Sequence, residues 1–346
     1  MGDSERIKYW DIIKGIAIIL VVYGHSFSER ESISTLLIYS FHMPLFMLIS
    51  GYFFYYTINK RSIVYIVKNK FFKTIVPIVL TTILIYFDTY NPKLTIHEQL
   101  VAFYAILIRE LWFLWAIFLD SMIVMAIYFS SKYISGLSMS SRLSPSLLFY
   151  SISAIVCVLF MVLPDISVIR DGVKFMFPCF IFGFCINQYD LTTVYKNNRV
   201  LILILCLVAY ICLFTKFDYA FTFYKSGVYI FNSFFSPNKM IFINIYRVVV
   251  GILGSLSLMM LVYEISQKVS IPSIVNSLAK LGQHTLGVYI LSWILNYYWL
   301  KLIPLQPHFN LYSLANTIVM LIVSYAITIL FIRFQSTIKQ RQTNNA

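Results

Sequence analysis

Residues 11–25 have the sequence DIIKGIAIILVVYGH, an apolar run of helical length bounded by a charged start and a histidine. Similar apolar runs recur along the chain, and together they decide its class. Of its 346 residues, 60% are hydrophobic and 12% are charged, and the mean hydropathy is +0.79. Soluble domains contain about 45–50% apolar and about 25% charged residues, because a polar shell must cover their core. Lipid must supply that cover here, so the composition excludes an ordinary soluble domain and predicts a polytopic membrane protein.

Ten apolar stretches reach the length of about 20 residues that a helix needs to cross a bilayer. They predict an all-α fold, a membrane bundle of about ten transmembrane helices that forms one domain over residues 1–346. Pro178 and Gly183 are positions where the sixth helix can break or tilt, and residues 264–283 are expected to form one of the longest loops. The predicted spans are residues 10–28, 36–57, 71–90, 111–130, 146–164, 173–188, 199–215, 240–263, 284–303 and 311–332.

The formal charge of +13 comes from 27 Lys and Arg residues against 14 Asp and Glu residues. Most of these basic residues lie at the two termini and in the even-numbered connections, which by the positive-inside rule places both termini in the cytoplasm. We therefore predict a multi-pass protein of the cell membrane, either the inner or the plasma membrane. Its predicted partner is the lipid bilayer, and we expect no nucleic-acid partner. No small-x-small cleavage site follows the first apolar run, so we expect it to remain as the first helix.

Ionisable residues inside a span are costly in lipid and usually face a bundle interior or a water-filled cavity. In the first span, Lys14 and His25 are eleven residues apart, within about 20° of one helix face and about 16 Å apart along its axis. Asp11 lies within about 40° of His25 on the same helix. We predict a polar stripe from the cytoplasmic end to the outer third of this helix; an interfacial ion pair between Asp11 and Lys14 is the alternative. A histidine side chain ordinarily titrates near neutrality, which makes His25 the best candidate for a general base.

A second histidine lies in SFHMPLFMLISGYFF, residues 40–54. Pro44 suits the first turn of a helix, so we expect His42 just before that turn, in the outer membrane interface. A short loop separates this segment from the end of the first span. The sequence therefore predicts that His25 and His42 approach each other at the outer rim.

Lysines crowd the start of the third span in KNKFFKTIVP, residues 68–77. They fit two interpretations, a positive anchor on the cytoplasmic side or a site where Lys70 and Lys73 meet the phosphates of a soluble anionic cofactor. As lysines they would act as point charges rather than as bidentate forks.

Other polar or reactive residues have a structural explanation. Arg109, Glu110 and Trp112 fit an ion pair and an aromatic belt at the outer start of the fourth span. Arg247 lies within a span and must find a partner or a cavity. The cysteines have no ligand spacing and no nearby histidine, so we expect packing thiols and no metal site. They are Cys157, Cys179, Cys185, Cys206 and Cys212.

Five motifs occur in order along the chain: K-G-I-x-I-x-L-V-V-x-G-H, F-H-M-P-L-F-x-x-I-S-G-Y, K-x-x-K, L-W-F-L and L-G-x-x-T-L-G-x-Y. In this order the chain resembles the acyltransferase 3 family of integral membrane acyltransferases, most closely its fucose 4-O-acetylase-like branch. The likeness covers nearly the whole chain. The first two motifs are specific and the last three are weak.

The resemblance implies an O-acetyltransferase that moves an acetyl group from cytoplasmic acetyl-CoA to a hydroxyl of a cell-surface or lipid-linked sugar, such as O-antigen or capsule. The family signature of a basic residue and a histidine in the first helix falls on Lys14 and His25, and the F-H-M-P histidine falls on His42. The basic pair of the family, often two arginines, falls on Lys70 and Lys73. Many relatives have a histidine near the end of the last motif, where this chain has Ser292.

On this basis we expect His25 to take the proton from the acceptor hydroxyl as it attacks the thioester, or to carry the acetyl group as an acetyl-histidine. Lys14 is expected to line the cofactor path, and His42 to bind substrate or assist proton transfer. Acceptor specificity is expected in outer loops, which hold residues such as Tyr219, Tyr224 and Trp299. A flippase or transporter of a lipid-linked saccharide is the alternative function, although transporters often show an internal repeat that this sequence lacks.

Overall fold

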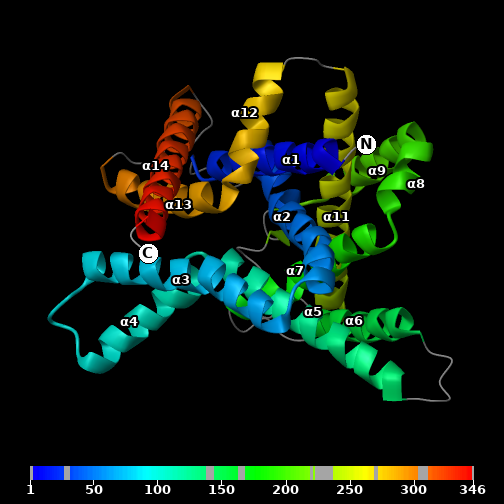
Figure 1. The fold of residues 1–346 in the computed structure, drawn as a ribbon, viewed down its shortest axis with the longest axis horizontal. Helices are drawn as coiled ribbons and strands as arrows, with labels where there is room; N and C mark the ends of the chain where they lie inside the picture. Colours follow the sequence, from blue (N-terminus) through cyan, green and yellow to red (C-terminus); the bar gives the residue numbers. More distant parts are fainter. Residues whose placement is uncertain are drawn as a thin grey trace. The chain divides into compact units, whose positions relative to one another are not determined.

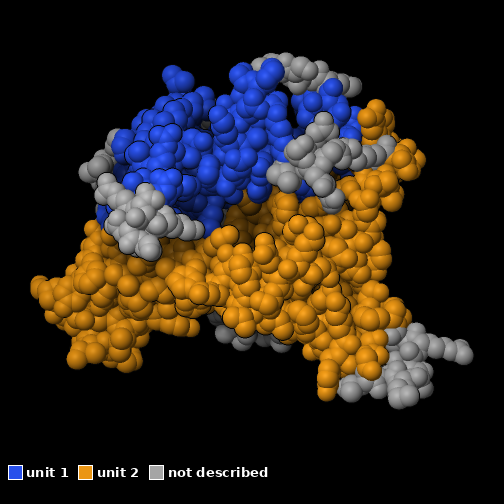
Figure 2. All heavy atoms as spheres, viewed as in Figure 1, with its two compact units in different colours: residues 1–42, 258–346 blue, residues 43–257 orange. Residues whose placement is uncertain are grey.

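The computed structural model describes residues 3–26, 32–137, 144–162, 168–218, 221–222, 237–268, 272–302 and 311–344. All regular secondary structure in these ranges is helical, which confirms the all-α prediction. Helices suit a lipid environment because they satisfy their backbone hydrogen bonds internally. The helices form two compact units, shown in different colours in Figure 2: unit 1 comprises residues 1–42 and 258–346, and unit 2 comprises residues 43–257.

Unit 1 is built around the first helix. Its α1 packs against three helices from the other end of the chain, α12, α13 and α14, and α13 packs against α14 (Figure 1). The helices of this unit are α1 (Asp3–Gly24), α12 (Pro272–Gln283), α13 (Thr285–Leu302) and α14 (Leu311–Asn344), with the start of α2 (Ile33–Lys60) and the end of α11 (Pro237–Lys268).

The contact between α1 and α12 depends on two glycines. A Cβ atom on Gly15 would collide with the backbone carbonyl of Leu278, and a Cβ on Gly282 would collide with that of Asp11. Each helix therefore supplies one glycine against the backbone of the other. Small residues at a crossing let two helices approach closely, which is how helices associate without a hydrophobic driving force. This crossing fixes the part of α1 that carries Asp11 and Lys14.

Unit 2 is centred on α5, which packs against α3, α6 and α7, while α4 packs against α3 (Figure 1). In this unit, α2 and α7 cross through Gly51 and Gly183 in the same reciprocal way as α1 and α12. Its helices are α3 (Ile63–Thr89), α4 (Ile96–Arg109), α5 (Trp112–Leu137), α6 (Pro145–Val162), α7 (Val168–Gln188), α8 (Leu191–Asn197) and α9 (Arg199–Phe214), with the remaining parts of α2 and α11.

Every predicted span overlaps a helix. Within the described residues, six helices are long and apolar enough to cross a membrane: α2, α3, α5, α6, α11 and α14. Shorter apolar stretches lie in α7 and α9. These helices support a membrane protein, while the count of ten spans and the cytoplasmic placement of both termini stay predictions.

The predicted loop over residues 264–283 is wrong, since α11 continues to Lys268 and α12 fills residues 272–283. Pro272 opens α12 at the one helical position where a missing N–H costs nothing. The prediction that Pro44 lies in a first turn is also wrong. The helix α2 begins at Ile33, where Ser32 Oγ accepts a hydrogen bond from the Thr35 N–H at 3.3 Å, so Pro44 lies inside the helix.

The helix α7 runs unbroken through Pro178 and Gly183, so neither residue breaks the sixth predicted span. The second of these glycines has a packing role, because its missing Cβ leaves room for the backbone of Leu48 in α2. The five cysteines all lie in described helices as free thiols; Cys179 is buried as a packing residue, whereas Cys212 is exposed.

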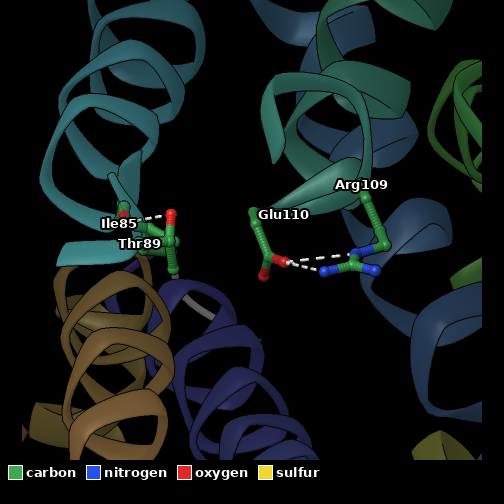
Figure 3. A network of polar contacts seen from close by, with 4 residues as sticks. All are labelled: Ile85, Thr89, Arg109 and Glu110. Carbon is green, nitrogen blue, oxygen red and sulfur yellow. Dashed lines mark hydrogen bonds and ion pairs between the residues drawn. The ribbon is translucent and has the colours of Figure 1, made fainter. Parts of the chain in front are cut away.

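The turn between α4 and α5 holds the predicted ion pair. Figure 3 shows Arg109 directed at Glu110, whose Oε1 accepts from Nε at 3.3 Å and from Nη2 at 3.2 Å. The next residue, Leu111, has a φ of 45° and is buried, which turns the chain sharply into α5. Trp112 is 6% exposed and packs against Gly172 of α7, so its predicted place in an aromatic belt is wrong.

Candidate active site

His25 lies in the turn that directly follows α1, where its backbone N–H donates to Val22 O at 3.2 Å. Its side chain borders a small, partly open cavity within unit 1. The walls come from α1 and the turn after it, and from α13 and α14, which lie more than 250 residues later in the sequence. The lining residues are Val21, Val22, His25, Ser26, Tyr289, Ser292, Trp293, Asn296 and Met320.

The imidazole of His25 is held from α13. The edge of Trp293 meets it with ring centroids 5.2 Å apart and an angle of 82° between the planes. The Asn296 side-chain amide donates to the His25 carbonyl at 3.4 Å. Ser292 lies in the same wall and donates its hydroxyl to Tyr289 O at 3.1 Å. The cavity therefore contains one titratable imidazole surrounded by neutral side chains.

His42 lies on the other side of a shared tyrosine. The Tyr39 ring is 6.4 Å from that of His25 and 5.2 Å from that of His42, and its hydroxyl donates to Gly24 O at 2.8 Å. His42 Nδ1 donates to Ile38 O at 2.7 Å, which leaves the lone pair on Nε2. Among the described residues, this Nε2 has no hydrogen-bond partner. The two histidines thus share one aromatic neighbour, but His42 is 1% exposed inside α2 rather than just before the first turn of a helix as predicted.

Lys14 forms an ion pair with Asp11, with Nζ 2.7 Å from Oδ1, and Gln283 donates to the other carboxylate oxygen at 3.1 Å. The prediction of a continuous polar stripe from Lys14 to His25 is wrong for this conformation. Ile18 and Val21 lie on the same helix face between them and are 0% and 3% exposed. The helical wheel correctly aligned the two ends, but apolar packing fills the interval.

Lys70 and Lys73 lie one turn apart on α3 in unit 2. The Lys70 ammonium is 5.2 Å from the centre of the Phe54 ring, and Lys73 is exposed. Neither lysine forms an ion pair with another described residue. The pair therefore offers two positive charges, without an acidic neighbour, to an anion that reaches this helix face.

Sequence reasoning overlooked two buried ionisable residues in unit 2. Asp120 of α5 is fully buried, and neither carboxylate oxygen has a hydrogen-bond partner among the described residues. Lys174 of α7 is 1% exposed, with its ammonium 5.2 Å from the Phe175 ring. The centre of the Phe175 ring also lies 4.2 Å from the Arg247 guanidinium. This ring is therefore the partner that Arg247 was expected to need inside its span. Asp120 and Lys174 could have been found from the sequence, because each is an ionisable residue inside an apolar run.

A family model described as "Acyltransferase domain" matches residues 7–333. Two curated relatives are both named Nodulation protein NolL. That of Sinorhizobium fredii (strain NBRC 101917 / NGR234) is 30% identical over 201 residues, covering 54% of this chain and 50% of the relative. That of Mesorhizobium japonicum (strain LMG 29417 / CECT 9101 / MAFF 303099) is 25% identical over 226 residues, covering 61% of this chain and 57% of the relative. The matched region thus spans about half the length of these relatives. No solved structure matches the chain.

Proposed function

Because the chain belongs to the acyltransferase family, we propose that it is a membrane O-acetyltransferase, which moves an acetyl group from acetyl-CoA to a hydroxyl of a cell-surface or lipid-linked sugar. The observation that carries this proposal is the position of His25. Its imidazole, a group that can accept a proton, borders a cavity of unit 1 whose other lining residues are uncharged.

In the proposed reaction, His25 removes the proton from the acceptor hydroxyl while its oxygen attacks the thioester carbonyl. The new C–O bond forms, the C–S bond breaks, and the proton passes from the imidazole to the leaving thiolate of coenzyme A. Proton transfer of this kind typically contributes about 10²–10⁴-fold to the rate. An acetyl-histidine intermediate would use the same ring as nucleophile, and rapid-quench mass measurement of the peptide with His25 distinguishes the two routes.

We propose that His42 assists this step through Nε2. With Nδ1 donating to Ile38 O, Nε2 is the acceptor atom, and burial disfavours a charge on the ring. His42 therefore suits a hydrogen bond to a neutral hydroxyl better than storage of a proton. Tyr39 keeps the two imidazoles in a fixed relation, since it contacts both rings and is tied to the end of α1.

We propose that the nucleotide phosphates of the donor bind at Lys70 and Lys73, on the cytoplasmic side predicted from the charge distribution. The ion pair with Asp11 holds Lys14 in place, so its proposed role is to line the donor path rather than to react. Ile18 and Val21 close the face of α1 beyond it. A route for the acyl chain along this face therefore requires those two side chains to move.

The test compares surface glycans from cells with and without the gene. Loss of one acetyl group per glycan repeat, with the glycan otherwise intact, supports the transferase. Loss of the whole glycan would support a flippase instead. Purified protein should also transfer radiolabelled acetyl groups from acetyl-CoA to a panel of cell-surface glycans, and failure with every acceptor would contradict the proposal.

A further inference from the structure

Three side chains on α13 and α14 bury polar atoms that have no hydrogen-bond partner among the described residues. These atoms are the indole N–H of Trp299, the hydroxyl of Tyr312 and both amide atoms of Asn316. The Asn316 side chain is almost completely enclosed, since the residue is 4% exposed. Buried polar groups in proteins nearly always have partners, so four such atoms on neighbouring helices call for an explanation.

The pairing of α13 with α14 places these groups at one end of the His25 cavity. Gly287 of α13 faces Thr328 of α14, since a Cβ on this glycine would meet the Thr328 side chain. Farther along α13, Ser292 and Asn296 share the cavity with Met320 of α14. Residue numbers thus rise along α13 as they fall along α14, so the two helices run antiparallel. Continuing this register beyond the cavity brings Trp299 to the level of residues 312–316.

Helical spacing also puts the polar groups on the faces that border the cavity. Asn316 lies four residues before Met320, and Tyr312 lies four residues before Asn316, so each is about 6 Å farther along the same face of α14. Trp299 follows Asn296 by three residues on α13 and occupies the same face one turn on. The unsatisfied groups therefore begin one helical turn from the cavity that contains His25.

The chemistry of the cluster specifies a neutral, hydroxyl-rich ligand. The indole N–H of Trp299 can donate a hydrogen bond, whereas the Tyr312 hydroxyl and the Asn316 amide can each donate and accept. The two aromatic rings can pack against the apolar C–H face of a ligand. None of the three side chains carries a charge that would select a phosphate or a carboxylate. A sugar unit combines several hydroxyls with an apolar ring face, which matches this set.

We propose that Trp299, Tyr312 and Asn316 form an acceptor subsite that binds a neutral sugar unit of the glycan, one to two helical turns beyond the cavity that His25 borders. This inference rests on the proposed function, since it identifies where the acceptor of that reaction binds. Trp299 was expected in an outer loop, but it is part of α13. Tyr219 and Tyr224, named with it, lie outside the described residues.

The test measures sugar binding without any acyl donor. Methyl glycosides of glucose, fucose and N-acetylglucosamine are titrated by saturation-transfer NMR against the full chain in lipid nanodiscs. We expect at least one glycoside to bind the wild type and His25→Ala alike. Tyr312→Phe and Asn316→Leu should each raise its Kd about three- to tenfold, as for loss of one or two hydrogen bonds. The matched control is Tyr325→Phe, which removes the same hydroxyl from a more distant turn of α14.

The outcomes separate the subsite from the reaction. If no glycoside binds, or if both variants bind as the wild type does, the groups are satisfied by water alone and the subsite is refuted. Glycoside binding that both variants weaken, in a protein that transfers no acetyl group, would retain the subsite and refute the activity. Acetyl transfer with an unchanged KM for the acceptor in both variants would retain the activity and refute the subsite.

Discussion

Gly282→Ala should loosen the crossing of α1 and α12. A Cβ at this position would lie 2.6 Å from the carbonyl carbon of Asp11, whereas carbon atoms in contact are about 3.5–4.0 Å apart. Because the carbonyl oxygen of Asp11 would lie closer still and backbone atoms meet on both sides, the helices must separate by at least about 1 Å. The Gln283–Asp11 hydrogen bond, now 3.1 Å, would then exceed the usual range.

Overpacking typically costs about 1–3 kcal/mol, and the weakened hydrogen bond adds about 1 kcal/mol. Alanine has a higher helix propensity than glycine, which stabilises the variant by about 1 kcal/mol. We therefore expect the free energy of unfolding to fall by about 1–3 kcal/mol in total. Reversible unfolding in detergent micelles gives this quantity. Gly136→Ala is the matched control, since nothing lies within 4 Å of its Cβ, and it should be neutral or slightly stabilising. Equal stabilities of the two variants would refute the packing argument.

Two further predictions concern other parts of the chain. Lys70→Ala combined with Lys73→Ala should raise the KM for acetyl-CoA more than it lowers kcat, because the loss of ground-state binding acts on KM. Steady-state kinetics measure both constants. An unchanged KM would refute phosphate binding by these lysines and leave them a membrane-anchoring role. At the start of α4, which lies outside the candidate spans, the backbone N–H and hydroxyl of Thr95 donate to Glu98 and hold the pKa of its carboxyl below the ordinary value of about 4.5. This cap should be complete above that pH and lost as the pH falls through the lower folded pKa. The protection factors of the first-turn amides of α4, corrected for the intrinsic pH dependence of exchange, should therefore fall in acid in the wild type. They should change little in Thr95→Ala, which lacks the cap at every pH.

The long apolar helices were predictable because lipid exposure leaves a strong compositional signal, and each predicted span overlaps a helix. Three shorter helices of the described residues were missed, α8 because it has only seven residues and the other two for the opposite reason. Both α4 and α12 are amphipathic and contain charged residues, so neither registers as a span. Their apolar residues at helical spacing were the available signal.

The site was predictable only in part. Motif resemblance selected His25 and His42, but nothing local in the sequence indicates that Trp293 and Asn296 hold the first of these from 268 and 271 residues away. The helical wheel also failed between Lys14 and His25, because it describes angular positions and not the packing that fills them. Long-range packing of α1 against α13 and α14 decides both features.

Acetyl transfer by His25→Ala tests the central claim most directly. Purified wild-type and variant proteins are compared for transfer of radiolabelled acetyl groups from acetyl-CoA to the acceptor glycan, with His97→Ala, an exposed histidine of α4, as the control. We predict that His25→Ala loses about 10²–10⁴-fold in kcat while its unfolding transition is retained, and that His97→Ala keeps full activity. A folded His25→Ala protein that transfers acetyl groups at the wild-type rate would contradict the account.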